Sequence, residues 1–251
     1  DMNSDVDKLL FEEITEKSIT LIKNDNDILP LKDISSKIAF LEMGGSNSDE
    51  FFKMLNHYTK VDKIEYDSEI LRKIEPYNTV IVGFHKSNKS PFDPYKFSKS
   101  DKEILELISK NKKVILNVFA KPYALMDVDM TNISSIIVSY QNNSTAQNKS
   151  AQIIFGALPA VGKLPVSINN KYPVHTSIKT TTLDRLSYGL PSNIIFDLDK
   201  LNSIDLFVED AIENKMTPGA QVLIAKNGKV IFNKNYGYKT YNKTEPIDWD
   251  N

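Results

Sequence analysis

The polar segment His85–Phe97 holds two side chains whose type and placement could serve chemistry. Asp93 is its single carboxylate, and His85 directly follows an apolar run. A carboxyl group in reach of a substrate can act as an acid, and an imidazole at a strand end can touch the substrate. An Asp between Phe92 and Pro94 also fits a turn in which it caps its own backbone, and His85 also fits an ordinary surface loop. Asp93 is therefore a candidate acid catalyst, and both residues are candidate substrate contacts, with these structural alternatives open.

Other reactive patterns are scarce. The sequence contains no cysteine, which excludes disulfides, thiolate metal sites and a cysteine nucleophile. His57, His85 and His175 lack the spacing of metal ligands, so no metal site is predicted. The single Ser-x-x-Lys match, Ser109–Lys112, lies at the end of a predicted helix and is attributed to chance. With neither a Gly-x-Ser-x-Gly elbow nor a phosphate-binding P-loop, no cofactor is predicted.

The turn Gly44-Gly45-Ser46 is a possible ligand site of a different kind. It follows a predicted strand, and Ser48 or Asp49 could cap the helix that comes next. A strand, a glycine turn and a helix can bind phosphate through free backbone N–H groups. Because the full Gly-x-Gly-x-x-Gly spacing is missing, the pattern favours a plain connection between a strand and a helix.

The positions of these candidate residues are set by an alternation of predicted strands and helices. Short apolar runs predict buried strands at Lys37–Met43, Thr79–Phe84, Lys113–Phe119 and Ser135–Tyr140. Amphipathic segments between and after them predict helices, one of them with a Ser100-x-x-Glu103 capping box. The order predicts an α/β fold: a doubly wound, mostly parallel sheet between helix layers, flavodoxin-like. In such sheets ligands lie beyond the carboxyl ends of the strands, here Gly44-Gly45, His85–Phe97, Ala120-Lys121 and Gln141–Asn143.

The N-terminal part predicts a long helix. Val6, Leu10 and Ile14 keep a helical spacing, and we expect the helix to continue through Leu21 and Ile22 to Lys23-Asn24. Asn24 would close it in the left-handed conformation. A polar turn, 25–27, and the apolar segment 28–31 with its proline would follow.

The composition is that of an ordinary globular protein. The chain has 251 residues, 41% hydrophobic and 25% charged, with a formal net charge of -2. This charge gives no field that would attract nucleic acid or an acidic membrane. No apolar run approaches the length of about 20 residues that a membrane span needs. The N-terminal residues do not resemble a signal peptide, and the sequence is expected to be cut from a longer polypeptide.

Three segments carry a resemblance to a known family. Ser18–Leu31 resembles a Ser-x-Thr-Leu-Leu-Lys-Asn run leading to Leu-Pro-Leu, and Ala151–Ile168 resembles a Phe-Gly-x-x-x-Pro-x-Gly-Lys-Leu-Pro-x-Ser signature. Phe119–Tyr123 looks like an Asn-Pro-Tyr turn, with Lys121 in place of Asn. Together they resemble the C-terminal α/β domain of family 3 glycoside hydrolases.

The resemblance implies a division of labour. In that family the nucleophile belongs to an N-terminal barrel, and some members take a Glu acid/base from the loop that corresponds here to His85–Phe97. This loop has no Glu. The missing Glu favours an accessory, non-catalytic domain of the β-N-acetylglucosaminidase type. Such a domain would pack on the barrel, would be inactive alone, and would contact glycan only by way of the barrel. One alternative is a β-glucosidase-type domain that supplies Asp93; another is a flavodoxin-like ligand-binding module.

The Thr- and Ser-rich segment 169–191 is interpreted as a surface strap. A second domain is predicted after it, with the boundary near Leu190-Pro191. We expect residues 1–190 to form the α/β domain and residues 191–251 a helix and a hairpin that turns at Asn227-Gly228. This tail resembles the start of serine β-lactamase-like domains and would be incomplete here. The two resemblances together imply a bacterial, exported parent protein that acts on cell-wall or chitin-type glycans.

Overall fold

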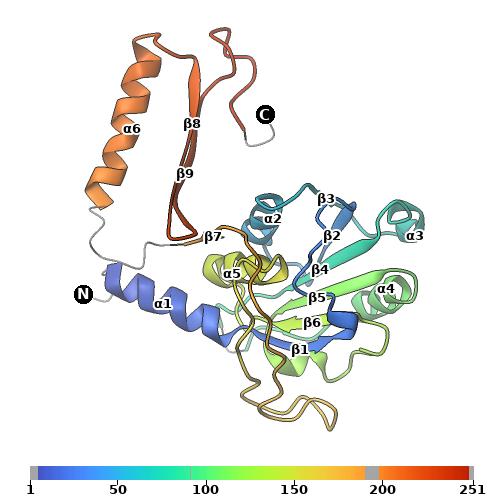
Figure 1. Cartoon of the computed structure of the whole chain (residues 1–251). Coiled ribbons are helices and arrows are strands. Elements are labelled where there is room, and N and C mark those ends of the chain that lie inside the picture. Colours follow the sequence, from blue (N-terminus) through green and yellow to red (C-terminus); the bar gives the residue numbers. More distant parts are fainter. Residues whose placement is uncertain (1–4, 91, 190–197, 249–251) are drawn as a thin grey trace. The chain divides into compact units, whose positions relative to one another are not determined.

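The computed structural model describes residues 5–90, 92–189 and 198–248 (Figure 1). These residues form two compact units. One is Glu13–Arg185, and the other combines the residues up to Glu12 with those from Leu186 onward. The domain boundary predicted at Leu190-Pro191 lies outside the described residues.

A six-stranded sheet in the order β1-β6-β5-β4-β2-β3 forms the centre of the first unit. Its strands are β1 (Thr20–Asn24), β2 (Ile38–Met43), β3 (Val61–Lys63), β4 (Thr79–His85), β5 (Lys113–Phe119) and β6 (Ser135–Val138). Strands β2 to β6 are parallel, and β1 joins β6 in the antiparallel sense. Every residue of β4 is buried, as expected where helices cover both faces of a sheet. The predicted doubly wound α/β fold is confirmed.

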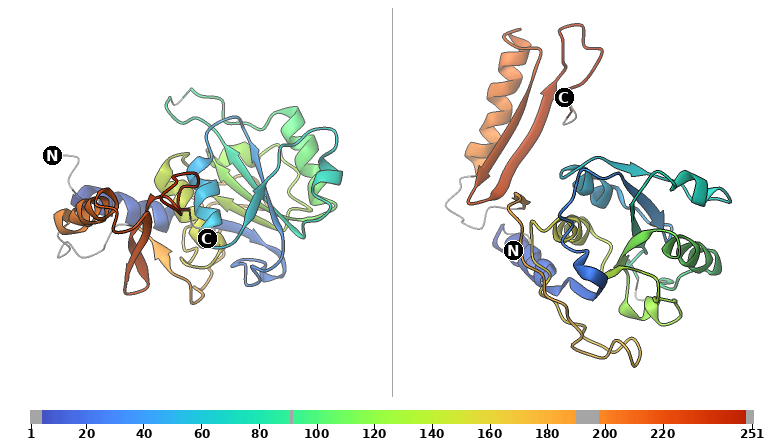
Figure 2. Two further views of the ribbon diagram at one scale, coloured as in Figure 1. Left: turned by 90° about the horizontal axis from the view of Figure 1, so that it is seen from above. Right: turned by 45° about the vertical axis from the view of Figure 1, so that its right-hand side comes forward.

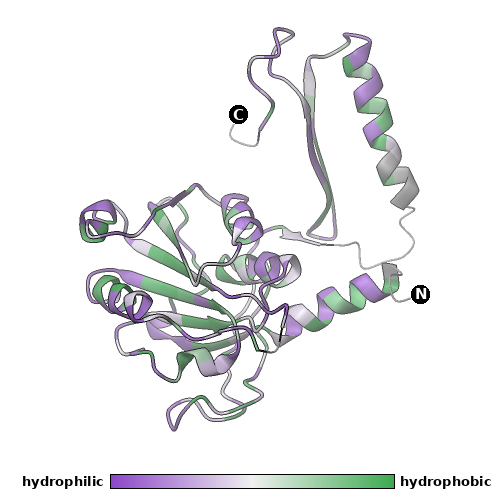
Figure 3. Ribbon diagram, turned by 180° about the vertical axis from the view of Figure 1, so that it is seen from behind, coloured by the Kyte–Doolittle hydropathy of each residue, from purple (hydrophilic) through white to green (hydrophobic). Residues whose placement is uncertain are grey.

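Helices lie on both faces of this sheet (Figure 2). On one face α2 (Asp49–Asn56) and α5 (Ser144–Ile154) pack against each other. On the other, α3 (Ile70–Lys73) and α4 (Lys99–Ser109) contribute buried side chains to the main apolar core. Helix α1 (Asp5–Ser18) precedes β1, and short 3-10 turns occupy Asp25–Asp27 and Pro122–Leu125. The hydrophobic colour in Figure 3 follows the central strands, where this core lies.

The predicted extension of the first helix to Lys23-Asn24 is wrong. Helix α1 ends at Ser18, and residues 20–24 form strand β1 beside β6. Ile19, Leu21 and Ile22 are almost fully buried, and consecutive buried positions suit a strand covered on both faces better than one face of a helix. The left-handed residues of the turn are Asn26 and Asp27 instead of Asn24.

The predicted capping box of α4 is also displaced. Ser98 is the N-cap: its hydroxyl accepts a hydrogen bond from the Asp101 N–H, and the Asp101 carboxylate accepts one from the Ser98 N–H. The N-cap therefore lies two residues before Ser100, the cap of the predicted Ser100-x-x-Glu103 box. An Asp at the third helical position performs the role that the sequence pattern assigned to Glu.

An extended strap after α5 runs along the first unit. Ile178 donates its N–H to the Leu21 carbonyl (2.8 Å), and Leu183 donates to that of Gly156 (2.7 Å). Residues 163–168, all described, form no strand. The Leu164 N–H donates a hydrogen bond to the Thr176 carbonyl of the strap.

The second unit contains a helix and a small sheet. Helix α6 (Leu198–Glu213) contributes Leu201 to an apolar cluster with the hairpin of β8 (Gly219–Lys226) and β9 (Lys229–Gly237), and β7 (Ser187–Tyr188) pairs with β9. Asn227 and Gly228 both have positive φ, as the predicted tight turn requires. Among the described residues, no helix has the length and apolarity to cross a membrane.

Candidate functional site

Strands β2 and β4 are neighbours in the sheet, and the strands that follow them in the sequence lie toward opposite edges of the sheet. Strand β3 follows β2 on one side, whereas β5 follows β4 on the other. In open α/β sheets ligands bind at such a switch point, outside the carboxyl ends of the strands. We call this region, residues 42–49, 85–90, 92–97 and 139–143, the carboxyl edge.

His85 ends β4 and is fully buried at the carboxyl edge, so the alternative of a surface-loop histidine is wrong. Its ring stacks on Phe119 with centroids 4.3 Å apart and lies 5.8 Å from the ring of Phe51. Its Nδ1 atom is 2.8 Å from Oδ1 of Asn142. Burial lowers the pKa of His85 to about 4, against a smaller opposing effect of the Asn142 hydrogen bond, so the imidazole is neutral near pH 7. Its role as a substrate contact stays a prediction, and any such contact would require the surrounding loops to move.

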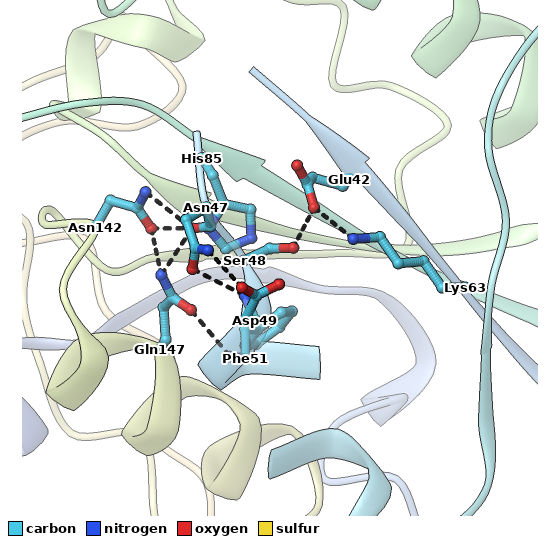
Figure 4. Close-up of polar contacts among 9 residues, drawn as sticks. All are labelled: Glu42, Asn47, Ser48, Asp49, Phe51, Lys63, His85, Asn142 and Gln147. Atoms are coloured by element: carbon cyan, nitrogen blue, oxygen red, sulfur yellow. Dashed lines mark hydrogen bonds and ion pairs between the residues drawn. The ribbon is translucent and has the colours of Figure 1, made fainter. Parts of the chain in front are cut away.

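An ionic cluster lies beside His85 and was not predicted from the sequence. Glu42 of β2 accepts hydrogen bonds from the Lys63 ammonium (2.8 Å) and the Ser48 hydroxyl (Figure 4). Partial burial raises the pKa of Glu42, but the bonds from Lys63 and Ser48 outweigh it and leave that pKa below its usual value. Ser48 therefore precedes α2 without capping it through its side chain, because its hydroxyl serves Glu42. A carboxylate held ionised in this way is a poor proton donor.

The geometry of Gly44 explains the glycine turn without a ligand. Gly44 has φ +90°, and a Cβ atom there would lie 2.3 Å from the His85 carbonyl oxygen. At the start of α2, the N–H groups of Asp49 and Phe51 already bond Oδ1 of Asn47 and Oε1 of Gln147. These bonds remove donors that a phosphate would need. The alternative of a flavodoxin-like ligand-binding module stays a prediction, and an increase in melting temperature with FMN, NAD or ATP would support it.

Asp93 lies in a turn of the loop after β4. Its carboxylate accepts hydrogen bonds from the Ser87 hydroxyl (2.6 Å) and the Ser90 N–H (3.1 Å). The Ser87 hydrogen bond is the main cause of a pKa below the usual value for Asp93. A general acid needs the opposite shift, because it must hold its proton near neutral pH. This geometry favours the turn-capping role over acid catalysis.

The other sequence candidates lie apart from the carboxyl edge. The Ser109 hydroxyl of the Ser-x-x-Lys match donates to the Glu106 carbonyl one turn earlier in α4. Within residues 5–90, 92–189 and 198–248, no group of three or more His, Asp or Glu side chains has the arrangement of a metal site. No residue of the described chain is therefore assigned to a metal.

Asn142 belongs to the carboxyl edge and Gln147 contacts this edge from α5, and both were missed as individual residues. Gln147, on α5, donates to Oδ1 of Asn142 (2.7 Å) and to the Asn47 carbonyl (2.9 Å). The sequence indicated the segment Gln141–Asn143 only as a strand end. Neither residue stands out by spacing, because their contacts join parts of the chain about a hundred residues apart.

The chain was compared with known protein families and with curated proteins. Residues 19–211 match the model of the glycosyl hydrolase family 3 C-terminal domain. A short stretch is also similar to Protein flp of Staphylococcus aureus, with 44% identity over 45 residues, which is 18% of this chain and 9% of that protein.

Solved structures share the fold. Beta-glucoside phosphorylase BglX aligns with a TM-score of 0.55 and 20% identity, over 66% of this chain and 32% of its own. A family 3 β-N-acetylglucosaminidase from Paenibacillus sp. aligns at 0.51 and 18%, over 66% and 33%. A fungal multi-domain β-N-acetylglucosaminidase of family 3 aligns at 0.55 and 18%, over 91% and 29%. The chain thus spans about a third of the length of these structures.

Proposed function

The chain belongs to the family of glycosyl hydrolase family 3 C-terminal domains, and from this premise we propose that it is the accessory, non-catalytic domain of a glycoside hydrolase. It packs on a catalytic barrel supplied by the same polypeptide and borders the cleft of that barrel with the carboxyl edge. Glycan reaches this domain only through the barrel. By itself the chain is inactive.

The loop after β4 carries this proposal. A member that took its acid/base from this domain would need there a carboxyl group with a raised pKa. The loop holds one carboxylate, Asp93, and two hydrogen bonds within a turn keep its pKa low. The acid/base is therefore assigned to the barrel, as in the β-N-acetylglucosaminidase type. In the alternative, a β-glucosidase-type domain supplies Asp93 as the acid, and a large loss of activity on replacing Asp93 would favour it.

The parent is proposed to be an exported bacterial hydrolase of cell-wall or chitin-type glycans. Similarity of the fold to two structures described as β-N-acetylglucosaminidases agrees with this subtype, although other similar structures are a phosphorylase and β-glucosidases. For the second unit we retain the β-lactamase-like proposal. Its support is the order of α6, hairpin and Asn227-Gly228 turn.

Hydrolysis of chromogenic β-GlcNAc and β-glucose substrates by the full-length gene product and by this chain tests the proposal. We expect β-GlcNAc hydrolysis by the full-length protein alone. Asp93→Asn is the decisive variant, and Asp129→Asn is its matched control, because Asp129 also accepts a local hydrogen bond, from the Thr131 N–H (2.9 Å). Both variants should keep kcat within about twofold. A loss of about a hundredfold in Asp93→Asn alone is the size expected for a lost general acid and would overturn the proposal.

A further inference from the structure

A continuous chain of polar groups crosses the carboxyl edge and ends at His85 (Figure 4). The Phe51 N–H donates to Oε1 of Gln147 (2.9 Å), and Nε2 of Gln147 donates to Oδ1 of Asn142 (2.7 Å). The same Asn142 oxygen lies 2.8 Å from Nδ1 of His85. We call these four groups the amide chain. It joins β4 to the start of α2, to α5 and to the segment after β6.

Two backbone groups fix the direction of every bond in the amide chain. A backbone N–H can only donate, so the Gln147 atom facing Phe51 must be its oxygen. A backbone carbonyl can only accept, and that of Asn47 faces the amide nitrogens of both Gln147 (2.9 Å) and Asn142 (3.2 Å). Turning either amide would bring donor against donor or acceptor against acceptor. The Asn142 oxygen therefore faces His85, and Nδ1 of His85 must carry the proton.

Among the described residues, the other imidazole nitrogen has no hydrogen-bond partner. Nε2 is buried, and a Cβ atom on Gly83 would lie 2.4 Å from it. The charged groups that act on the ring are Glu42 of β2 and Lys63 of β3, which are paired with each other. A proton on Nε2 would thus place a charge and an unsatisfied donor inside the domain, in agreement with the low pKa of His85.

We propose that His85 is a positioning residue: its neutral imidazole, held as the Nδ1–H tautomer by the amide chain, fixes the segments after β2, β4 and β6 at the carboxyl edge. The tautomer follows from the contacts within this domain alone. The consequence for substrate binding rests on the proposed function, because only there does this edge border a cleft. His85 acts through these segments and does not itself touch substrate.

The tautomer can be read by nuclear magnetic resonance of the 15N-labelled chain. In the Nδ1–H form the unprotonated nitrogen is Nε2, which couples to both carbon-bound ring protons, whereas in the Nε2–H form it is Nδ1, which couples strongly to only one. We expect the first pattern for His85, persisting through pH 5. The Nε2–H pattern, or a ring protonated on both nitrogens at pH 5, would overturn the proposal.

Two substitutions of Asn142 separate the amide chain from general packing. Asn142→Asp keeps an oxygen for His85, so the Nδ1–H pattern should persist or give way to a charged ring. Asn142→Leu removes the acceptor, and the preference for Nδ1–H should disappear. Gln141→Ala, at the exposed neighbouring position, should change nothing. An unchanged tautomer in Asn142→Leu would show that the amide chain does not select it.

Steady-state kinetics of the full-length protein test the positioning role. His85→Asn keeps an amide donor near the Nδ1 position, whereas His85→Gln moves it toward Nε2. We expect His85→Gln to raise KM about threefold or more with kcat within about twofold, and His85→Asn to recover most of the loss. Equal KM values with the tautomer confirmed would remove the positioning role. Absence of any glycosidase activity would contradict the proposed function and leave the tautomer result standing.

Discussion

Gly83 lies directly beneath the imidazole of His85, and a Cβ atom at Gly83 would come within 2.4 Å of Nε2 and 2.9 Å of the Phe40 ring. The two residues are next but one on β4 and face the same side of the sheet. Glycine is required at this position because a side chain would collide with these rings. The backbone conformation does not require it, since the φ of Gly83 is not left-handed. Stacking on Phe119 and the bond to Asn142 hold the ring in this place.

Gly83→Ala should therefore destabilise the chain. The added methyl group must displace a buried ring that cannot turn away without losing its hydrogen bond, at a cost of about 1–3 kcal/mol. Gly45→Ala is the control: it has φ +76° and open space around its Cβ position, so only backbone strain of about 1 kcal/mol is expected. Chemical denaturation measures both. Equal losses would show that the ring of His85 moves freely.

Protonation of His85 should make stability depend on pH. Its pKa in the folded chain, about 4, is lower than the ordinary 6.5, so the unfolded chain takes up the proton first as the pH falls. The stabilisation is complete above pH 6.5 and is lost progressively between pH 6.5 and 4, by about 3 kcal/mol in total. Comparison with His85→Asn isolates this contribution from that of the carboxylates. Parallel stability curves for the two proteins would contradict it.

Arg185 should anchor the strap. Its guanidinium donates to the carbonyls of Leu31 (2.6 Å), Phe155 (2.5 Å) and Lys32 (2.9 Å). Arg185→Met removes these donors and should cost about 1–3 kcal/mol, with faster proteolysis between residues 169 and 185. Arg185→Lys should recover only part, because an ammonium lacks the planar fork. Lys179→Met, at an exposed strap position, should leave both measurements unchanged.

Lys23 should stabilise β1 through its buried ammonium. Nζ donates to the carbonyls of Met130 (2.9 Å) and Thr131 (2.8 Å) and lies 3.0 Å from the Asp25 carboxylate. Lys23→Met keeps the length of the side chain but leaves these groups without their donor, at a cost of about 1–3 kcal/mol in thermal or chemical unfolding. Lys60→Met, at an exposed position, should stay within about 0.5 kcal/mol of the unchanged chain. A similar small effect for Lys23→Met would show that water replaces its donor.

Several elements followed from local sequence alone. The apolar runs of β2, β4 and β5 and the strand–helix alternation were sufficient for the doubly wound sheet, because a buried parallel strand needs a continuous apolar run. Residues 20–24 were assigned wrongly because their helical spacing continues that of α1, while their partner, β6, lies more than a hundred residues away. The helix or strand propensity of a short segment does not reveal a partner strand so far away in the sequence.

The sequence by itself determined the fold class, the carboxyl edge as the place to look, and the missing Glu of the loop after β4, since these depend on periodicity, strand order and composition. The tertiary structure alone decided that His85 is buried and neutral, that Asp93 is held ionised in a turn, and that Glu42, Asn142 and Gln147 belong to the same region. The physical reason is that a proton's position depends on burial and on the direction of neighbouring hydrogen bonds. In this chain those neighbours come from β2, β4, α5 and the segment after β6, which only folding brings together.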